Sequence, residues 1–355
     1  MSSILSNRVQ KVKPSATMAV SDKAKELKSQ GIQIVSMGSG EPDFDTPANI
    51  QKAAVKAIGA GETRYTPADG TPELKKAICE KFKRENGLDY SATEVMVSCG
   101  GKQVFYNLCQ AILNEGDEVI IPTPYWVSYP DMAILADATP VFIEAGLDQD
   151  FKITPDQLEA SITPKSKLFV LNSPSNPTGS VYSRSEIIAL GEVLERHPHV
   201  LTISDDIYEH IRWGEDDFVN IAMACPKLKE RVVILNGVSK AYAMTGWRIG
   251  YAAGPEVVIK AMKKIQGQST SNPSSISQAA ALEAITGDQS FISMMVEAFE
   301  RRHEFLVTSL NEIDGIECPR SGGAFYSFPK VQGLIQRLGL KDDVEFQLSA
   351  LKSLV

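Results

Sequence analysis

Short apolar runs alternate with amphipathic stretches along this chain, and that alternation constrains the fold more than any other feature. The runs are rich in β-branched residues and cover residues 95–98, 118–121, 167–171, 200–204 and 232–235. Amphipathic stretches include residues 71–86, 103–113 and 183–196, and the last opens with Ser183 and Glu186 in the spacing of a capping box. Strands separated by helices predict an α/β fold with a mostly parallel sheet flanked by helices on both faces.

The pattern changes after residue 254. Helices follow, including a long one over about residues 289–311, and then short strands near residue 316 and over 324–328. We therefore expect an N-terminal arm and part of a small α+β domain in residues 1–45, a large domain in 46–290, and the rest of the small domain in 291–355. Segment 342–355 has apolar residues at helical spacing but no Gly or Asn cap, so we expect the chain to be cut inside an element.

The charge balance limits the partners that we expect. The net charge is −8, and basic residues are scattered among acidic ones, which argues against nucleic acid or an anionic membrane as partner. We find no apolar run of membrane-spanning length and no secretory signal at the start, although the first twenty residues, which lack acids, faintly resemble a transit peptide. Five scattered cysteines without a Cys-x-x-Cys pair favour the cytoplasm. The pair His197 and His199 has no further ligand nearby, so we predict no metal site.

Polar residues follow the predicted strands, which is where ligands bind in open parallel sheets. Gly100, Gly101 and Lys102 stand between a strand and a helix. Backbone N–H groups at such a helix start indicate an anion site, most simply for phosphate, although a Gly pair is also typical of a tight turn. Trp126 follows the next strand and could stack on a flat heteroaromatic ring or pack in the core.

Three later strands end in the same way. Asn176 lies in the Pro-bracketed loop NSPSNPTG and could donate to a ring oxygen or simply form a turn. Asp205 and Tyr208 lie three residues apart, and the carboxylate could cap a helix or keep a pyridine nitrogen protonated. Lys240 follows the strand at 232–235, and the small residues and Arg248 after it are not typical of a solvated face, although most lysines are exposed.

These motifs together resemble the class I PLP-dependent aminotransferases of fold type I, where PLP is pyridoxal 5′-phosphate, and especially the bacterial aspartate aminotransferase branch. The most specific stretch is SKAYAMTGWRIGY at residues 239–251. It is supported in order by GEPDF, YTPADG, GGKQ, PYW, NSPSNPTG and SDDIYE. The resemblance covers essentially the whole chain and implies that residues 46–290 form a PLP-binding domain.

The resemblance also implies roles for individual residues. Lys240 would carry PLP as a Schiff base and then move the Cα proton as base and acid. Asp205 would pair with the pyridine nitrogen, and Tyr208 would contact the ring hydroxyl. The other implied cofactor contacts are Asn176 at the ring hydroxyl, Trp126 on the ring face, Gly100, Gly101, Lys102, Ser239 and Arg248 at the phosphate, and Tyr65 from a second subunit. A homodimer with shared sites follows.

The dicarboxylic branch further implies a substrate set. Ser15, Thr17 and Lys102 match the groups that hold a distal carboxylate, and Gly40, Trp126 and Asn176 complete the set. This implies ping-pong exchange of an amino group between aspartate or glutamate and a 2-oxo acid, namely 2-oxoglutarate or oxaloacetate. Alternatives are an aromatic or prephenate aminotransferase, a β-lyase on the same scaffold, and a non-catalytic regulator.

One departure from the family pattern concerns the substrate α-carboxylate. Family members continue to a strand with an Arg that pairs with this group, and nothing after Val355 supplies it. Either the sequence is truncated here or another residue substitutes for this Arg. For a truncated chain we expect retained PLP binding with impaired turnover.

Overall fold

The sheet lies at the centre of the computed structural model, which describes residues 4–12, 25–33, 37–38, 40–214 and 216–352. Seven strands are hydrogen-bonded in the order β1–β7–β6–β5–β4–β2–β3. All neighbours are parallel except β7, which runs antiparallel to both β1 and β6. The strands are β1 (Val95–Ser98), β2 (Glu118–Thr123), β3 (Thr139–Glu144), β4 (Ser166–Asn172), β5 (Leu201–Asp205), β6 (Val232–Gly237) and β7 (Gly250–Ala253).

The five strands predicted from apolar runs are confirmed, whereas β3 and β7 were missed. Strand β3 is an edge strand that carries Pro140 and is largely unburied, so its pattern is weak. Strand β7 reads GYAA, and its small side chains give little strand signal although all four residues are buried. Strands β3 and β7 were therefore missed because of their amino-acid composition, not because the alternation of strands and helices was misread.

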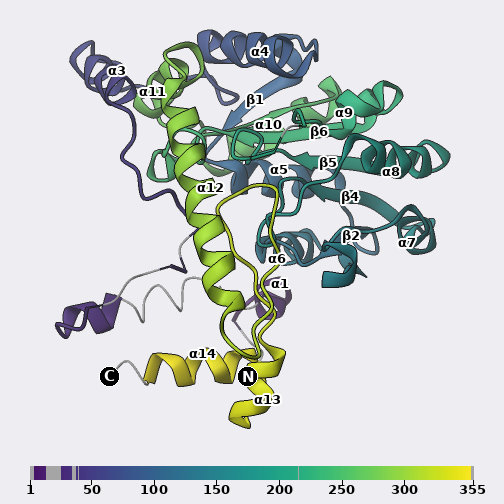
Figure 1. Cartoon of the computed structure of the whole chain (residues 1–355). Helices are drawn as coiled ribbons and strands as arrows, with labels where there is room; N and C mark the ends of the chain where they lie inside the picture. Colours follow the sequence, from purple (N-terminus) through teal and green to yellow (C-terminus); the bar gives the residue numbers. More distant parts are fainter. Residues whose placement is uncertain (1–3, 13–24, 34–36, 39, 215, 353–355) are drawn as a thin grey trace.

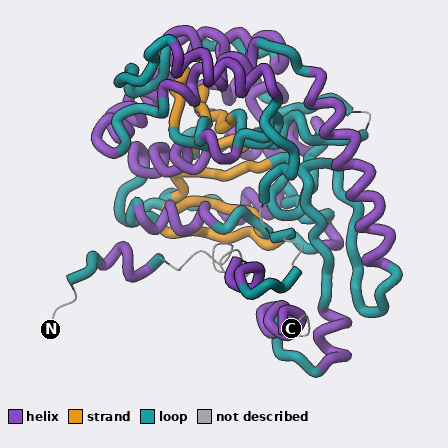
Figure 2. The backbone as a smooth tube through the Cα atoms, turned by 90° about the vertical axis from the view of Figure 1, so that its left-hand side faces the viewer, coloured by secondary structure: helices purple, strands orange, loops and turns teal. Residues whose placement is uncertain are grey.

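Helices cover both faces of the sheet, as Figure 2 shows for the strands between two helical layers. Along β2, Val119 and Ile121 join one core cluster while Ile120 joins the other, as expected for side chains that alternate across a sheet. The first cluster lies under α5 (Gly101–Ile112), α6 (Ser128–Leu135) and α10 (Glu256–Ser269). The second lies under α3 (Ala48–Gly59), α4 (Pro72–Asn86), α7 (Pro155–Ser161), α8 (Arg184–Arg196), α9 (Ile221–Ala224) and α11 (Ser275–Thr286). The predicted two-sided α/β layering is confirmed.

The predicted helix boundaries follow from their caps. The Thr71 hydroxyl accepts from the N–H of Leu74 at the start of α4, and Gly87 ends that helix with φ 67°. At the start of α8, Ser183 and Glu186 form the predicted capping box.

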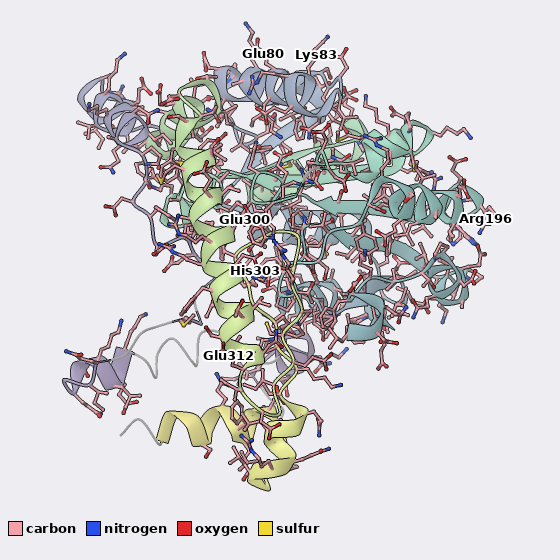
Figure 3. All side chains as sticks on the ribbon, viewed as in Figure 1. Glu80, Lys83, Arg196, Glu300, His303 and Glu312 are labelled. Atoms are coloured by element: carbon pink, nitrogen blue, oxygen red, sulfur yellow. The ribbon has the colours of Figure 1, made fainter. Side chains whose placement is uncertain are left out.

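The chain after α11 forms a long helix and two short ones. Helix α12 (Ser290–Asn311) runs along one side of the molecule, and α13 (Gln332–Leu338) and α14 (Asp343–Lys352) lie beyond its C-terminal end (Figure 1). The labelled side chains of Glu300, His303 and Glu312 follow one another along α12 and just past its end (Figure 3). His303 is buried, and its ring centroid lies 5.2 Å from that of Trp213. The long helix predicted over 289–311 and a helix within 342–355 are confirmed.

The short strands predicted near residue 316 and over 324–328 are wrong. The structure has only isolated bridges here, between Arg212 and Gly323 and between Glu317 and Lys330. Prolines and glycines interrupt this segment, so its apolar residues cannot extend a ladder. The domain boundaries at residues 45 and 290 stay predictions. Within the described part of the chain, no helix is both long and apolar enough to cross a membrane.

Candidate active site

A cavity of about 380 Å³ at the carboxyl ends of the central strands brings most of the predicted residues together. It forms there because β4, β5 and β6 are parallel and in register, with Asn172 beside Asp205 and Asp205 beside Leu235. The loops after these strands therefore meet at one edge. The predicted residues that line it are Gly40, Gly101, Lys102, Trp126, Asn176, Asp205, Tyr208, Ser239, Lys240 and Arg248.

Asp205 is a buried carboxylate at the end of β5, with 4% of its surface exposed. One oxygen accepts from the Tyr129 hydroxyl at 2.5 Å, and the other accepts from the Ile207 N–H at 3.3 Å. Burial raises the pKa of Asp205 to about 6, although the Tyr129 hydrogen bond opposes that shift. A turn follows rather than a helix, so the alternative that this acid caps a helix is wrong.

Lys240 lies in the turn after β6, with its amine in the cavity. Its Nζ donates to the carbonyl of Gly40 and lies 5.7 Å from the ring centroid of Tyr208. Burial lowers the pKa of Lys240 to about 8, and the nearby Arg248 charge acts in the same direction. A substantial neutral fraction is therefore present near pH 8, which an amine needs to act as a nucleophile or base.

Cations and backbone N–H groups meet at the start of α5. Gly100 precedes this helix with φ 89°, and a Cβ there would collide with the Arg248 guanidinium, so only glycine fits. Arg248 donates to the carbonyls of Thr245 at 2.9 Å and Cys99 at 3.4 Å. Lys102 extends over the Trp126 ring at 5.1 Å, and partial desolvation together with Arg248 lowers the pKa of Lys102. Two cations beside a helix N-terminus form a site for an anion.

Aromatic and amide groups form the remaining wall. Trp126 lines the cavity and also packs against the core, with its ring 5.2 Å from that of Tyr129, and its stacking on a heteroaromatic ring stays a prediction. Asn172 accepts from the N–H of Asn176 at 2.8 Å and donates to the carbonyl of Asp205 at 2.8 Å. The loop that carries Asn176 is thereby tied to β5.

Some predicted residues lie elsewhere. Ser15 and Thr17 are outside the described residues. Tyr65 is 91% exposed and borders a separate surface hollow of about 950 Å³ beside α3 and α11. Gly100 adjoins the cavity through Arg248 rather than lining it.

Two tyrosines at the site were not predicted. Tyr129 lies on α6, and its hydroxyl donates to Asp205. Its position three residues after Trp126 is the one local signal that could have identified it. Tyr326 shares a hydrogen bond of 2.6 Å with Tyr208, and it comes from a segment more than a hundred residues further along the chain. Only tertiary structure places it here. The other unpredicted lining residues are Glu41, Ile207, Leu235 and Thr245.

A largely desolvated amine, a buried acid and a cluster of cations at a helix start surround one cavity at the strand ends, an arrangement typical of an enzyme active site in the α/β class. The family described as Aminotransferase class I and II matches residues 32–352. The chain belongs to this family of PLP-dependent aminotransferases.

Individual relatives agree with this family. The chain is 58% identical over 331 residues to the aspartate/prephenate aminotransferase of Cereibacter sphaeroides, covering 93% of this chain and 83% of that protein. Among solved structures, the aspartate aminotransferase from Rhizobium meliloti is 50% identical with a TM-score of 0.90, covering 93% of this chain and 82% of that one. The Thermus thermophilus aspartate aminotransferase with maleate is 45% identical with a TM-score of 0.88, covering 92% and 84%.

Proposed function

We propose that this chain binds PLP on Lys240 and exchanges an amino group between a dicarboxylic amino acid and a 2-oxo acid in ping-pong fashion. One observation carries the proposal: the Lys240 amine and the Asp205 carboxylate line the same cavity, and burial shifts both pKa values toward neutrality. Groups with such shifts cluster at catalytic sites.

The residues present fit PLP at each of its polar ends. Among the described residues no cation forms an ion pair with Asp205, so a protonated ring nitrogen would supply the missing positive charge. The phosphate would lie at the start of α5. The residues that would hold the group are Lys240 covalently, Asp205 at the ring nitrogen, Asn176 and Tyr208 at the ring hydroxyl, Trp126 on the ring face, and Gly100, Gly101, Lys102, Ser239 and Arg248 at the phosphate.

Bound PLP supplies an electron-withdrawing ring that accepts the charge left when a substrate carbon loses its proton. The chain's own groups do the rest. The lowered pKa of Lys240 lets its Nζ take a proton and return it, and the Gly40 carbonyl fixes the position of that nitrogen. Asp205, once ionised, stabilises positive charge opposite it, and the Tyr129 hydroxyl fixes its carboxylate.

A dicarboxylic substrate is supported by the relatives and by the cations of the site. The Cereibacter sphaeroides relative is named for aspartate and prephenate, both of which carry two carboxylates, and the Thermus thermophilus structure contains maleate, another dicarboxylate. We propose that Lys102, Ser15 and Thr17 hold the distal carboxylate and that Gly40, Trp126 and Asn176 border the substrate. Prephenate is included as an amino acceptor.

We further propose a cytoplasmic homodimer in which Tyr65 reaches the phosphate of the partner's PLP. Tyr65 is exposed in one protomer, and Val55 and Ile58 on α3 are also exposed apolar side chains. An interface would cover them. Light scattering of the wild type should give twice the chain mass, and Tyr65→Phe should keep the dimer while weakening PLP binding.

Reduction and peptide mapping test the cofactor assignment. The protein loaded with PLP should show a visible band that borohydride removes, and the label should map to the peptide containing Lys240. Lys240→Ala should lose the label, whereas Lys264→Ala, on the outer helix α10, should retain it. A label on another lysine, or none in the wild type, overturns the proposal.

Half-reactions test the chemistry separately. Aspartate or glutamate should convert the visible band and release a 2-oxo acid in one equivalent, and 2-oxoglutarate should restore the band. Continuous release of pyruvate and ammonia from a sulfur amino acid without an acceptor would instead assign a β-lyase.

A further inference from the structure

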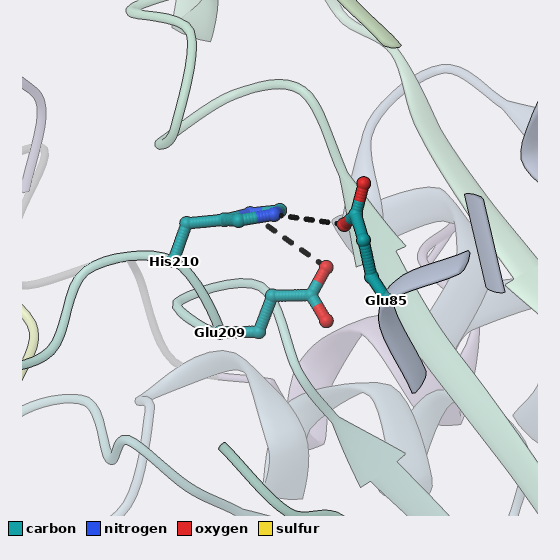
Figure 4. Close-up of side chains that lie close together, drawn as sticks. All are labelled: Glu85, Glu209 and His210. Atoms are coloured by element: carbon teal, nitrogen blue, oxygen red, sulfur yellow. Dashed lines mark hydrogen bonds and ion pairs between the residues drawn. The ribbon is translucent and has the colours of Figure 1, made fainter. Parts of the chain in front are cut away.

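A charged cluster that runs from the buried Glu209 to the exposed Glu85 lies next to the active site and is not used in the chemistry above. The side chains of Glu85, Glu209 and His210 lie close together (Figure 4), and the oxygen and nitrogen atoms that could bind a metal are within 4.8 Å of one another. Glu209 directly follows Tyr208, and it is only 5% exposed. The cluster therefore begins one residue away from a wall of the cavity.

Lys81 occupies the position that a metal ion would take in this cluster. Its Nζ pairs with Glu209 and lies 3.4 Å from Glu85, and the side chain is 1% exposed. The positive charge is thus already present, and a divalent cation would have to displace a buried ammonium. The cluster is an ion-pair network rather than a candidate metal site.

Glu209 links three separate segments. Beyond Lys81, its carboxylate accepts from Asn86 at 3.1 Å, and both of these donors lie on α4. It also accepts from Asn236 at 2.7 Å, at the end of β6. The Asn236 side chain in turn accepts from the N–H of Gly237, three residues before Lys240. One carboxylate thereby fixes α4, the Tyr208 turn and the chain that leads to Lys240.

The charges of this network reinforce the geometry. Burial alone would raise the pKa of Glu209, but the neighbouring charges of Lys81 and His210 outweigh it and lower that pKa. Glu209 is therefore ionised and matched by a buried cation, which gives its hydrogen bonds the strength of charge-assisted bonds.

We propose that Glu209, held by Lys81, is a positioning residue that sets Tyr208 and Lys240 relative to each other at the cofactor. This inference rests on the proposed PLP site. The segments that Glu209 would position can nevertheless be observed without PLP. Neither Glu209 nor Lys81 lines the cavity. Their effect on the cofactor site must therefore pass through two loops, namely the turn at residues 205–211 and the segment at residues 236–242.

Glu209→Gln tests the role while conserving the shape of the side chain, and Glu85→Gln is the matched control. Glu85 pairs with the same lysine and, through His210, with the Tyr208 turn, but it makes no hydrogen bond to the β6 segment that leads to Lys240. In the cofactor-free protein, hydrogen exchange of residues 205–211 and 236–242 should quicken by about tenfold in Glu209→Gln, and exchange of residues 236–242 should stay unchanged in Glu85→Gln. In the loaded protein, Glu209→Gln should shift the pH midpoint of the visible band and lower kcat with little change in KM.

The outcomes separate this inference from the proposed function. If wild-type protein carries PLP on Lys240 while Glu209→Gln matches Glu85→Gln in exchange, band midpoint and kcat, the positioning role is overturned. A wild type that carries no PLP would overturn the proposed function, yet the exchange experiment would still decide whether Glu209 holds both loops. Should Glu209→Gln fail to fold, Asn236→Ala removes the link from Glu209 to β6 together with the acceptor of the Gly237 N–H, and exchange should quicken in residues 238–242 while 205–211 stays unchanged.

Discussion

The cofactor-free protein should lose stability as Asp205 ionises, and Asp205→Asn should abolish that loss. Burial raises the pKa of Asp205 from 3.8 to about 6. The folded state therefore binds this proton more tightly than the unfolded state does. Its contribution to stability is fully present below about pH 4 and is lost as pH rises through about 6. Two pKa units correspond to roughly 3 kcal/mol of unfolding free energy.

Urea unfolding across this pH range measures the effect at a fixed protein concentration, since assembly shifts apparent stability. Subtracting the unfolding free energies of Asp205→Asn from those of the wild type should leave a difference that falls by roughly 3 kcal/mol between about pH 4 and pH 7. Asp148→Asn, at an exposed carboxylate, should leave the wild-type pH profile unchanged. A flat difference between wild type and Asp205→Asn would refute the reasoning, because Asp205 would then ionise in the fold as freely as in the unfolded chain.

Three further outcomes follow from the same structure. Acylation of Lys240 in the cofactor-free protein, followed by peptide mass spectrometry, should reach half its maximal rate near pH 8, because burial lowers the pKa of that amine to about 8. Arg248→Lys should weaken PLP binding by roughly tenfold in equilibrium dialysis, since lysine cannot keep the planar contacts to Thr245 and Cys99. Ser183→Ala should lower the free energy of unfolding by about 1 kcal/mol in urea, because the N-terminal cap of α8 is lost.

The sheet could be predicted from the sequence because its parallel strands are buried on both faces. Continuous apolar runs such as those of β4 and β6 are typical of strands that helices cover on both sides. The same logic located the site, since the carboxyl ends of parallel strands must meet at one edge. Asp205 and Lys240 could therefore be placed together without knowledge of any distance between them.

The parts that were missed depend on contacts between distant segments. The hydroxyl of Tyr326 reaches Tyr208 only because the chain after α12 returns to the turn that carries Tyr208. Segment 316–330 has the apolar content of strands, but its prolines and glycines allow only single bridges. Lys81 carries no local sign of burial either, because a lysine in an amphipathic helix is ordinarily solvated and only the approach of Glu209 explains its position.

The pKa shifts of three ionisable groups in the cavity each disfavour the charged form of that group. Burial lowers the pKa of Lys240 and raises that of Asp205, and partial burial and Arg248 lower that of Lys102. Each group is thus destabilised in its ionised state while no ligand is bound. A ligand with negative charge beside α5 and positive charge beside Asp205 would reverse the shifts of Asp205 and Lys102 together. Binding would then offset the cost of keeping these groups buried, so we expect the cavity to favour a molecule that carries opposite charges at its two ends.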